Sequence, residues 1–186
     1  MQSKMSLLKE NVSRVVIGKE GALDLFLVGL IARGHILVED VPGVGKTLMA
    51  RAIAASCRIK FRRLQCTPDL MPTDVTGFFT YDKKNGEFTF RPGPVMTNIL
   101  LVDEINRAVP RTQSSLLESM EERQATVDGQ TFPLPSPFMV MATQNPIEME
   151  GTFPLPEAQL DRFLLKVDMG YPTAEEEEEI LLTHGK

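Results

Sequence analysis

The stretch Asp40-Val41-Pro42-Gly43-Val44-Gly45-Lys46-Thr47 has the composition of a loop that binds phosphate groups. It connects a predicted strand, 35–38, to a predicted helix, 46–56, which is the context that such a loop requires. Gly43 and Gly45 allow backbone N–H groups to approach phosphate oxygens without a Cβ in the way. The helix that begins near Lys46 points the positive end of its dipole at the same anion. The stretch therefore predicts a triphosphate site.

Two side chains of this loop carry the expected chemistry. Lys46 supplies a mobile positive charge for the β- and γ-phosphates, and Thr47 supplies a hydroxyl ligand for Mg²⁺. Asp40 stands where the usual pattern G-x-x-x-x-G-K-[ST] has its first glycine, and aspartate tolerates unusual turn dihedrals better than most residues. The alternative is a glycine-rich turn with a chance Lys-Thr pair, which seldom arises between a strand and a helix.

Two acids, Asp103 and Glu104, follow the continuous apolar run 99–102, which is typical of a central parallel strand. An aspartate at the carboxyl end of such a strand can hold Mg²⁺, and a glutamate directly after it can polarise the attacking water. We therefore expect this strand to adjoin the one that precedes the phosphate loop. Alone, two such acids would more often cap a helix. Asn145 follows the predicted strand 138–142 and is a candidate for positioning the water, although Asn-Pro is also a common turn.

Strands alternate with helices along the chain, which predicts an α/β sheet with right-handed crossovers. Apolar periodicity predicts further helices over 19–33, 111–123 and 157–161, and further strands over 61–65 and 164–167. Asn85-Gly86 and Asp128-Gly129 predict two β-hairpins, formed by 78–81 with 87–90 and by 125–127 with 131–134. Thr173 and Glu176 have the spacing of a capping box and open an acidic helix.

The composition and net charge of the chain also exclude several classes of protein and of binding partner. The 186 residues are 42% apolar and 24% charged, which excludes disordered, collagen-like and disulfide-framework classes. A net charge of −5 argues against broad electrostatic binding to nucleic acid or to an anionic membrane, and no apolar run approaches the ~20 residues that a bilayer requires. Cys57 and Cys66 match neither a zinc pattern nor a disulfide set, so we expect reduced thiols in a cytoplasmic protein.

Taken together, these motifs resemble those of AAA+ ATPases and, within that class, of the MoxR family, whose own pattern has aspartate at the position of Asp40. The resemblance rests on four segments, 39–47, 102–108, 142–146 and 155–163. It implies a P-loop α/β fold, with a parallel five-stranded sheet flanked by helices and two β-hairpin inserts, over 1–170. It also implies that 171–186 begin a C-terminal helical lid, and that the chain stops before the rest of that lid and its sensor-2 arginine.

The resemblance assigns roles to single residues. Lys46 and Thr47 resemble the Walker A pair, and Asp103 and Glu104 the Walker B pair, with Glu104 as the catalytic base. The segment Val16-Ile17-Gly18 is similar to the one that lines the adenine pocket. The implied set of nucleotide-binding residues is Val16, Ile17, Gly18, Pro42, Gly43, Val44, Gly45, Lys46, Thr47 and Leu48.

Two further residues complete the implied catalytic set. Asn145 resembles the sensor-1 residue. Arg162 resembles the arginine finger, which reaches the γ-phosphate bound by a neighbouring subunit and makes hydrolysis depend on assembly. Without the resemblance, Arg162 would be interpreted as a surface arginine paired with a nearby acid.

The implied activity is Mg²⁺-dependent ATP hydrolysis in a homo-oligomeric ring, with a hexamer as the family expectation. The ring would power chaperone-like remodelling, or metal-cofactor insertion, in a client such as a von Willebrand factor A-type domain protein, without specific nucleic acid or membrane insertion. In related machines the hairpins face the central pore, where Phe78, Phe79 or Tyr81 would contact the client; ordinary surface hairpins are an equal alternative. Two other functions stay open, namely a nucleotide-gated binding module without turnover in this lidless form and a magnesium-chelatase-like ATPase subunit.

Overall fold

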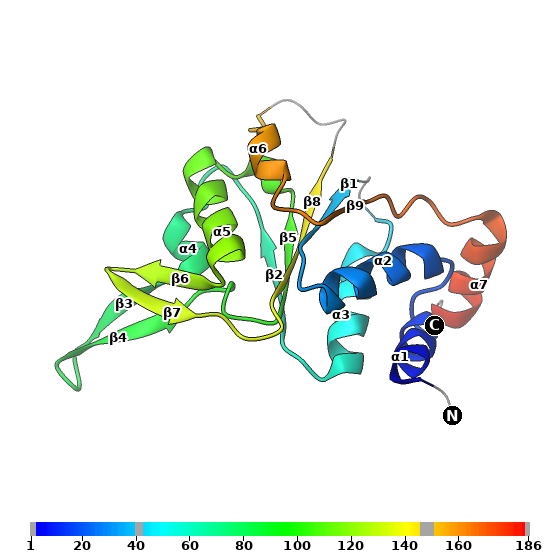
Figure 1. Cartoon of the computed structure of the whole chain (residues 1–186), viewed down its shortest axis with the longest axis horizontal. Helices are drawn as coiled ribbons and strands as arrows, with labels where there is room; N and C mark the ends of the chain where they lie inside the picture. The colour runs from blue at the N-terminus through cyan, green and yellow to red at the C-terminus, as the bar shows by residue number, and fades with distance from the viewer. Residues whose placement is uncertain (1–2, 40–42, 146–150, 185–186) are drawn as a thin grey trace.

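The computed structural model describes residues 3–39, 43–145 and 151–184. Its centre is a sheet of five parallel strands in the order β2-β5-β8-β1-β9 (Figure 1). The strands are β1 (Ile36–Glu39), β2 (Phe61–Gln65), β5 (Ile99–Asp103), β8 (Met139–Gln144) and β9 (Leu165–Val167). The prediction of a five-stranded parallel sheet is thus confirmed.

The position of the acidic strand corrects one expectation. β5 does not adjoin β1, because β8 lies between them and pairs with both. The burial of each strand accounts for the order. Residues 139–143 of β8 are all buried, which suits a strand at the centre of the sheet. β2 exposes Arg62 and Arg63 and takes an edge.

Helices cover both faces of the sheet (Figure 1). α1 (Lys4–Ser13), α2 (Glu20–Ile31) and α3 (Lys46–Cys57) share an apolar core with Ile99 and Leu101 of β5. α4 (Pro72–Thr76) and α5 (Pro110–Glu122) share the core on the other face with Leu100 and Val102. The continuous apolar run of β5 therefore serves two cores at once, as expected of a central parallel strand. Within the described residues, none of the helices combines the length and apolar character that crossing a bilayer demands.

The short helices differ in how well the sequence indicates them. α1 has a single buried residue, Val12, and so it has no apolar stripe to predict it. α4 has five residues, and the 3₁₀ turn η1 (Ile105–Arg107) has three. By contrast, α6 (Glu157–Leu160) and α7 (Ala174–His184) were expected. The capping box of α7 is present, because Thr173 N donates to Glu176 Oε2 over 2.8 Å and Glu176 N donates to Thr173 Oγ1 over 3.3 Å.

Both predicted hairpins are present, as β3 (Gly77–Asp82) with β4 (Glu87–Pro92) and as β6 (Gln124–Val127) with β7 (Gln130–Pro133). They lie beside each other and project away from the sheet (Figure 1). Phe79, Phe90 and Phe132 join them, with the rings of Phe90 and Phe132 stacked at 4.0 Å. Of the candidate client contacts, Phe79 is therefore half-buried between the hairpins, whereas Phe78 and Tyr81 are exposed.

Candidate nucleotide site

Of the predicted phosphate loop, the structure describes the residues from Gly43 onward. Gly43 and Gly45 have φ angles of 94° and 89°, in the left-handed region that favours glycine. A Cβ built at either position would meet no atom within 4 Å, so packing within the chain does not require glycine there. The two residues instead form a backbone cradle that faces open space, at the point where α3 begins. Such a cradle fits a phosphate group.

The cradle opens into a cavity of about 340 Å³. Lys46, Thr47 and Leu48 line it from the first turn of α3, Asp103 and Glu104 from the end of β5, and Asn145 from the end of β8. The cavity thus brings together residues that are far apart in the sequence. Pro42, another predicted binding residue, lies outside the described residues. The full lining is Gly43, Gly45, Lys46, Thr47, Leu48, Arg63, Gln65, Asp103, Glu104, Thr143, Gln144 and Asn145.

The register of the sheet determines which side chains reach this cavity. Gln65 of β2 pairs with Asp103 of β5, and Thr143 of β8 pairs with Val38 of β1. Val102 of β5 pairs with Ala142 of β8, so the next residues of the two strands, Asp103 and Thr143, are also neighbours. Because side chains alternate between faces, Asp103 lies on the same face as Ile99 and Leu101, which is the face that α3 covers. The metal candidate and the phosphate loop therefore share one face of the sheet.

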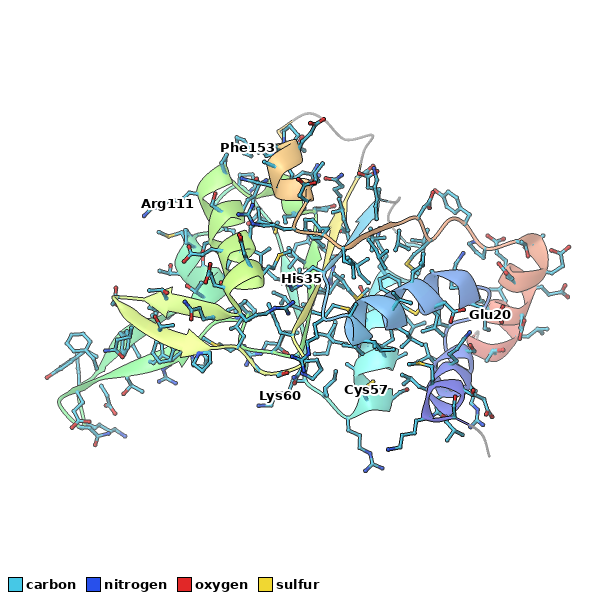
Figure 2. The ribbon with its side chains drawn as sticks, in the orientation of Figure 1. Glu20, His35, Cys57, Lys60, Arg111 and Phe153 are labelled. Carbon is cyan, nitrogen blue, oxygen red and sulfur yellow. The ribbon has the colours of Figure 1, made fainter. Side chains whose placement is uncertain are left out.

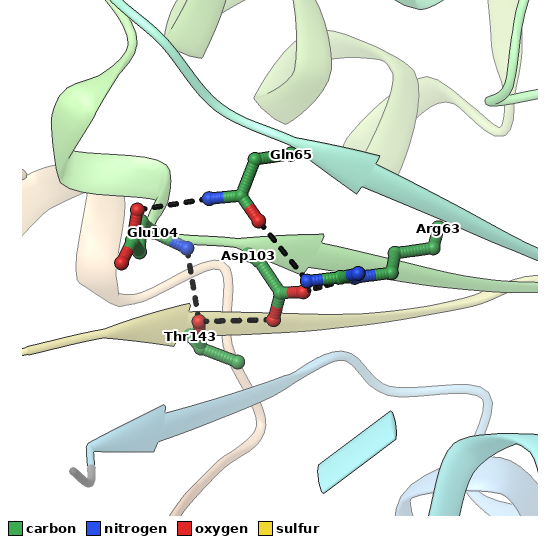
Figure 3. Close-up of polar contacts among 5 residues, drawn as sticks. All are labelled: Arg63, Gln65, Asp103, Glu104 and Thr143. Carbon is green, nitrogen blue, oxygen red and sulfur yellow. Dashed lines mark hydrogen bonds and ion pairs between the residues drawn. The ribbon is translucent and has the colours of Figure 1, made fainter. Parts of the chain in front are cut away.

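A network of hydrogen bonds holds the two acids (Figure 3). Asp103 is 8% exposed, and its Oδ2 accepts from Arg63 Nε over 2.5 Å. Glu104 Oε2 accepts from Gln65 Nε2 over 2.8 Å. Thr143 joins the acids, because its hydroxyl accepts from Glu104 N over 2.9 Å and donates to Asp103 Oδ1 over 3.4 Å.

The backbone of Glu104 contributes to this arrangement. Its φ and ψ angles are 56° and 52°, a left-handed conformation that costs energy in a residue other than glycine. This turn ends β5 and begins η1, where Arg107 Nε lies 3.3 Å from Glu104 Oε2. A strained residue at the rim of a polar cavity is typical of a functional site.

The donor set can be compared with what Mg²⁺ requires. Within the described residues, no group of three or more His, Cys, Asp or Glu side chains is placed to hold a metal. Asp103 and Thr47 both line one cavity, and each carries an oxygen atom that could bind a cation. Mg²⁺ keeps several waters and takes one or two protein oxygens together with substrate phosphates, so these residues fit that ion.

A second cavity, of about 230 Å³ and mostly apolar, lies on the other side of the phosphate loop. Four residues of the predicted nucleotide-binding set line it, namely Val16, Ile17, Val44 and Leu48. Gly18 does not line it: a Cβ there would lie 2.1 Å from the Glu176 carboxyl carbon, so this glycine allows α7 to approach. Pro172 and Ile180 also line the pocket, which the sequence did not indicate.

Burial changes the pKa of two groups near the sheet. His35 lies just before β1 (Figure 2), and burial, with a smaller contribution from the positive charge of Arg123, lowers its pKa to about 4. Burial, together with the negative charges of Asp103 and Glu104, raises the pKa of the Cys66 thiol to about 12. Both cysteines are free, and Cys66 stays protonated, so it is not a nucleophile for this site.

Comparison with known proteins agrees with this geometry. Residues 35–165 match the sequence profile of the ATPase family associated with various cellular activities (AAA). The chain is 60% identical to the YeaC protein of Bacillus subtilis and 53% identical to Chaperone MoxR1 of Mycobacterium tuberculosis, covering 92% and 94% of this chain. The solved structure of a protein assigned as an ATPase, from Cytophaga hutchinsonii, superposes with a TM-score of 0.89 over 96% of this chain, at 44% identity.

This chain belongs to the MoxR family of AAA+ ATPases. It spans about half the length of these relatives, namely 54% of YeaC, 46% of MoxR1 and 54% of the Cytophaga hutchinsonii chain.

In this MoxR-family chain, Arg162 lies apart from the nucleotide cavity. Its Nε donates to Glu121 Oε2 over 2.8 Å, and it lines a different cavity with Arg33 and His35. Those residues precede β1, whereas the phosphate loop follows it. The structure therefore does not bring Arg162 together with Glu104 and Asn145 within one chain.

Four side chains that line the cavity were missed in the sequence analysis, namely Arg63, Gln65, Thr143 and Gln144. Arg63 and Gln65 alternate with the buried Leu64 on β2, which indicates that they share a face but does not say which strand β2 adjoins. Thr143 stands two residues before the predicted Asn145, at the end of a buried strand. Only the sheet order makes these residues neighbours of the two acids.

Proposed function

We propose that this chain binds ATP with Mg²⁺ and hydrolyses the terminal phosphate bond within a ring of identical subunits. The sheet register supports this most directly, because it brings Asp103 and Glu104 to the cavity that the phosphate loop and Lys46 line. A chain that only held a phosphate would need the loop and the lysine, but not a strained glutamate beside a buried aspartate.

Each residue then has one task. The backbone at Gly43 and Gly45 binds phosphate oxygens, and the Lys46 ammonium neutralises them. Thr47 and Asp103 hold Mg²⁺, which when bound stabilises the charge that develops on the phosphate oxygens.

Glu104 accepts a proton from the attacking water, and Asn145 fixes the position of that water. Arg162 acts on the phosphate bound by the neighbouring subunit, and its placement away from the nucleotide cavity of its own chain supports an action between subunits. A hexamer is the expected assembly.

We propose that residues 1–170 form the nucleotide-binding core and that 171–186 begin a helical lid. Pro172 and Ile180 line the apolar base pocket beside Val16, which supports a lid that closes over the base.

We also propose that the output is mechanical, namely remodelling of a client protein or insertion of its metal cofactor in the cytoplasm, where the free thiols stay reduced. The name of the relative MoxR1, a chaperone, supports such an output. A client carrying a von Willebrand factor A-type domain would dock at the exposed end of the β3–β4 hairpin, where Tyr81 and Phe88 are 53% and 71% exposed.

One observation favours the second candidate, a nucleotide-gated binding module without turnover. Oε2 of Glu104 is bound by Gln65 and by Arg107, and Arg162 is bound by Glu121, so the proposed catalytic groups are engaged in contacts within the chain. Under this alternative the chain binds ATP and changes a surface, but the terminal phosphate stays attached.

Equilibrium binding of a fluorescent ATP analogue and the rate of phosphate release test the proposal. Lys46→Ala should abolish binding. Glu104→Gln should keep the Kd and reduce turnover about 100-fold or more, because a positioned general base contributes that much. Glu178→Gln makes the same chemical change at an exposed residue of α7 and should leave both values unchanged.

Two results would contradict the proposal. Turnover by Glu104→Gln at the wild-type rate would remove Glu104 as the base. Binding without any phosphate release by the wild type, in a single turnover at saturating ATP, would favour the binding module.

A further inference from the structure

The proposed metal ligand Asp103 already has a cationic partner. Arg63 Nε lies 2.5 Å from Asp103 Oδ2, and the Arg63 side chain is 53% exposed, against 11% for Asp103 (Figure 3). A carboxylate that is buried this far requires a positive charge or several hydrogen-bond donors. Thr143 also donates to this carboxylate, over a longer 3.4 Å. Arg63 makes the shorter contact and carries a positive charge, so it compensates the Asp103 charge more strongly than Thr143 does.

Two cations cannot both use this carboxylate at close range without repelling each other. We propose that Arg63 competes with Mg²⁺ for Asp103 and thereby sets the metal affinity of the site. This inference rests on the proposed function, in which Asp103 holds the metal. Arg63 is then a positioning residue: it orients the buried carboxylate, and it yields the carboxylate to the metal that arrives with the nucleotide.

The position of Arg63 allows its guanidinium to leave Asp103. It lies on β2, an edge strand of the sheet, and half of its side chain is in contact with solvent, so the guanidinium can leave Asp103 and remain hydrated. Asp103 comes from a central strand whose residues are all buried, so it cannot move in the same way. The mobile partner of this ion pair is therefore the arginine.

A second contact holds Arg63 in place. Its Nη2 donates to Gln65 Oε1 over 3.1 Å, and the Gln65 amide nitrogen donates in turn to Glu104. Displacing Arg63 from Asp103 would thus disturb the residue that holds the proposed base. Gln65 should accordingly favour Arg63 over the metal, but less strongly than the guanidinium charge itself does.

The test measures the Kd of a slowly hydrolysed fluorescent ATP analogue in Mg²⁺ and in EDTA. Arg63→Met keeps the length of the side chain and removes the charge. It should tighten binding in Mg²⁺ about three- to tenfold, the range of a partly exposed ion pair with a charge-assisted hydrogen bond, and it should not tighten binding in EDTA. Arg62→Met removes the same charge from the opposite face of β2, where Arg62 is exposed, and should change neither Kd.

Gln65→Ala refines the test, because it removes only the contact that holds Arg63. It should tighten binding in Mg²⁺ less than Arg63→Met does, and the double variant should match Arg63→Met alone. A Kd in Mg²⁺ that is unchanged or weaker in Arg63→Met would overturn the inference, since Arg63 would then bind phosphate or support the metal site. A wild type that binds the analogue equally well in Mg²⁺ and EDTA would instead overturn the proposed metal role of Asp103, and the inference with it.

Discussion

Arg162 pairs with Glu121, with its Nη2 2.7 Å from Glu121 Oε2, near the start of β1 and β9. Asp103 and Gly43 line a different cavity, where β5 and β1 end, so Arg162 lies at the other end of β1 from the candidate nucleotide site. Either Arg162 acts on the nucleotide of a neighbouring subunit or it is a surface residue with an acidic partner. Mixing two inactive variants distinguishes these possibilities.

Arg162→Ala keeps Glu104, and Glu104→Gln keeps Arg162. Each variant alone should bind ATP and lose most of its turnover. A 1:1 mixture should regain activity, because some interfaces then combine an intact Glu104 with an intact arginine from the adjacent subunit. Phosphate release by each variant and by the mixture, at a concentration that permits assembly, checks this. Full activity of Arg162→Ala alone would assign Arg162 to the surface pair with Glu121.

Thr143 should matter to catalysis without contacting the nucleotide. Its hydroxyl accepts from Glu104 N and donates to Asp103 Oδ1, so Thr143→Val would leave a partly buried N–H without an acceptor and loosen both acids. We expect a loss of about 1–3 kcal/mol in the free energy of unfolding, and about tenfold lower turnover, with the Kd for ATP nearly unchanged. Thr143→Ser retains the hydroxyl and should recover most of the rate. Denaturant unfolding and steady-state kinetics of the two variants measure both effects.

His35 should make the stability of the fold depend on pH. Its Nδ1 accepts from Val140 N over 2.9 Å, and its Nε2 lies 3.1 Å from Met120 O, so the neutral ring with a proton on Nε2 satisfies both contacts. Burial lowers its pKa from 6.5 to about 4, so between these values the unfolded chain binds the proton more readily than the folded chain does. The stabilisation by the neutral ring is therefore complete above pH 6.5 and is lost as the pH falls toward 4.

The expected loss over that range is about 3 kcal/mol. Denaturant unfolding from pH 4 to pH 7 should show a shallower dependence on pH in His35→Gln, whose amide offers a donor and an acceptor but does not titrate. Equal slopes for wild type and variant would show that other groups cause the acid sensitivity.

The sequence predicted the parts of this fold that depend on local patterns. The glycine-rich turn before Lys46, the apolar run 99–102 and the two Xaa-Gly hairpin turns each specify an element through backbone conformation or burial on both faces. These signals lie within a few residues of the element that they specify, so a single sequence contains them.

The order of the strands is not local information, and there the prediction was wrong. β5 was expected beside β1, but β8, which begins only at Met139, lies between them. The lack of information about strand order also explains why the sequence analysis missed Arg63 and Gln65. Their contact with the two acids depends on β2 pairing with β5, a pairing that no residue of β2 specifies alone.

The stability of the β3–β4 hairpin should depend on its contact with Phe132 of the β6–β7 hairpin. Phe79 and Phe90 share one face of the β3–β4 hairpin with Tyr81 and Phe88, because each pair is directly cross-strand. Phe132 of β7 covers only the pair nearer the sheet, and the pair nearer the turn stays exposed. The stack on Phe132 therefore fixes the hairpin that carries the exposed aromatic residues.

Phe132→Ala should loosen the β3–β4 hairpin by about 0.5–1.5 kcal/mol while the sheet stays folded, since an aromatic stack contributes about that much and the hairpin can open locally. Trypsin cleavage after the exposed Lys83 and Lys84, at the hairpin turn, should then become about five- to tenfold faster. Phe88→Ala removes a ring of the same size that is 71% exposed, and should leave the cleavage rate within about twofold of the wild type. If Phe132→Ala is cut no faster than the wild type, the β3–β4 hairpin holds its position without the second hairpin, and its exposed end is not aligned by the stack.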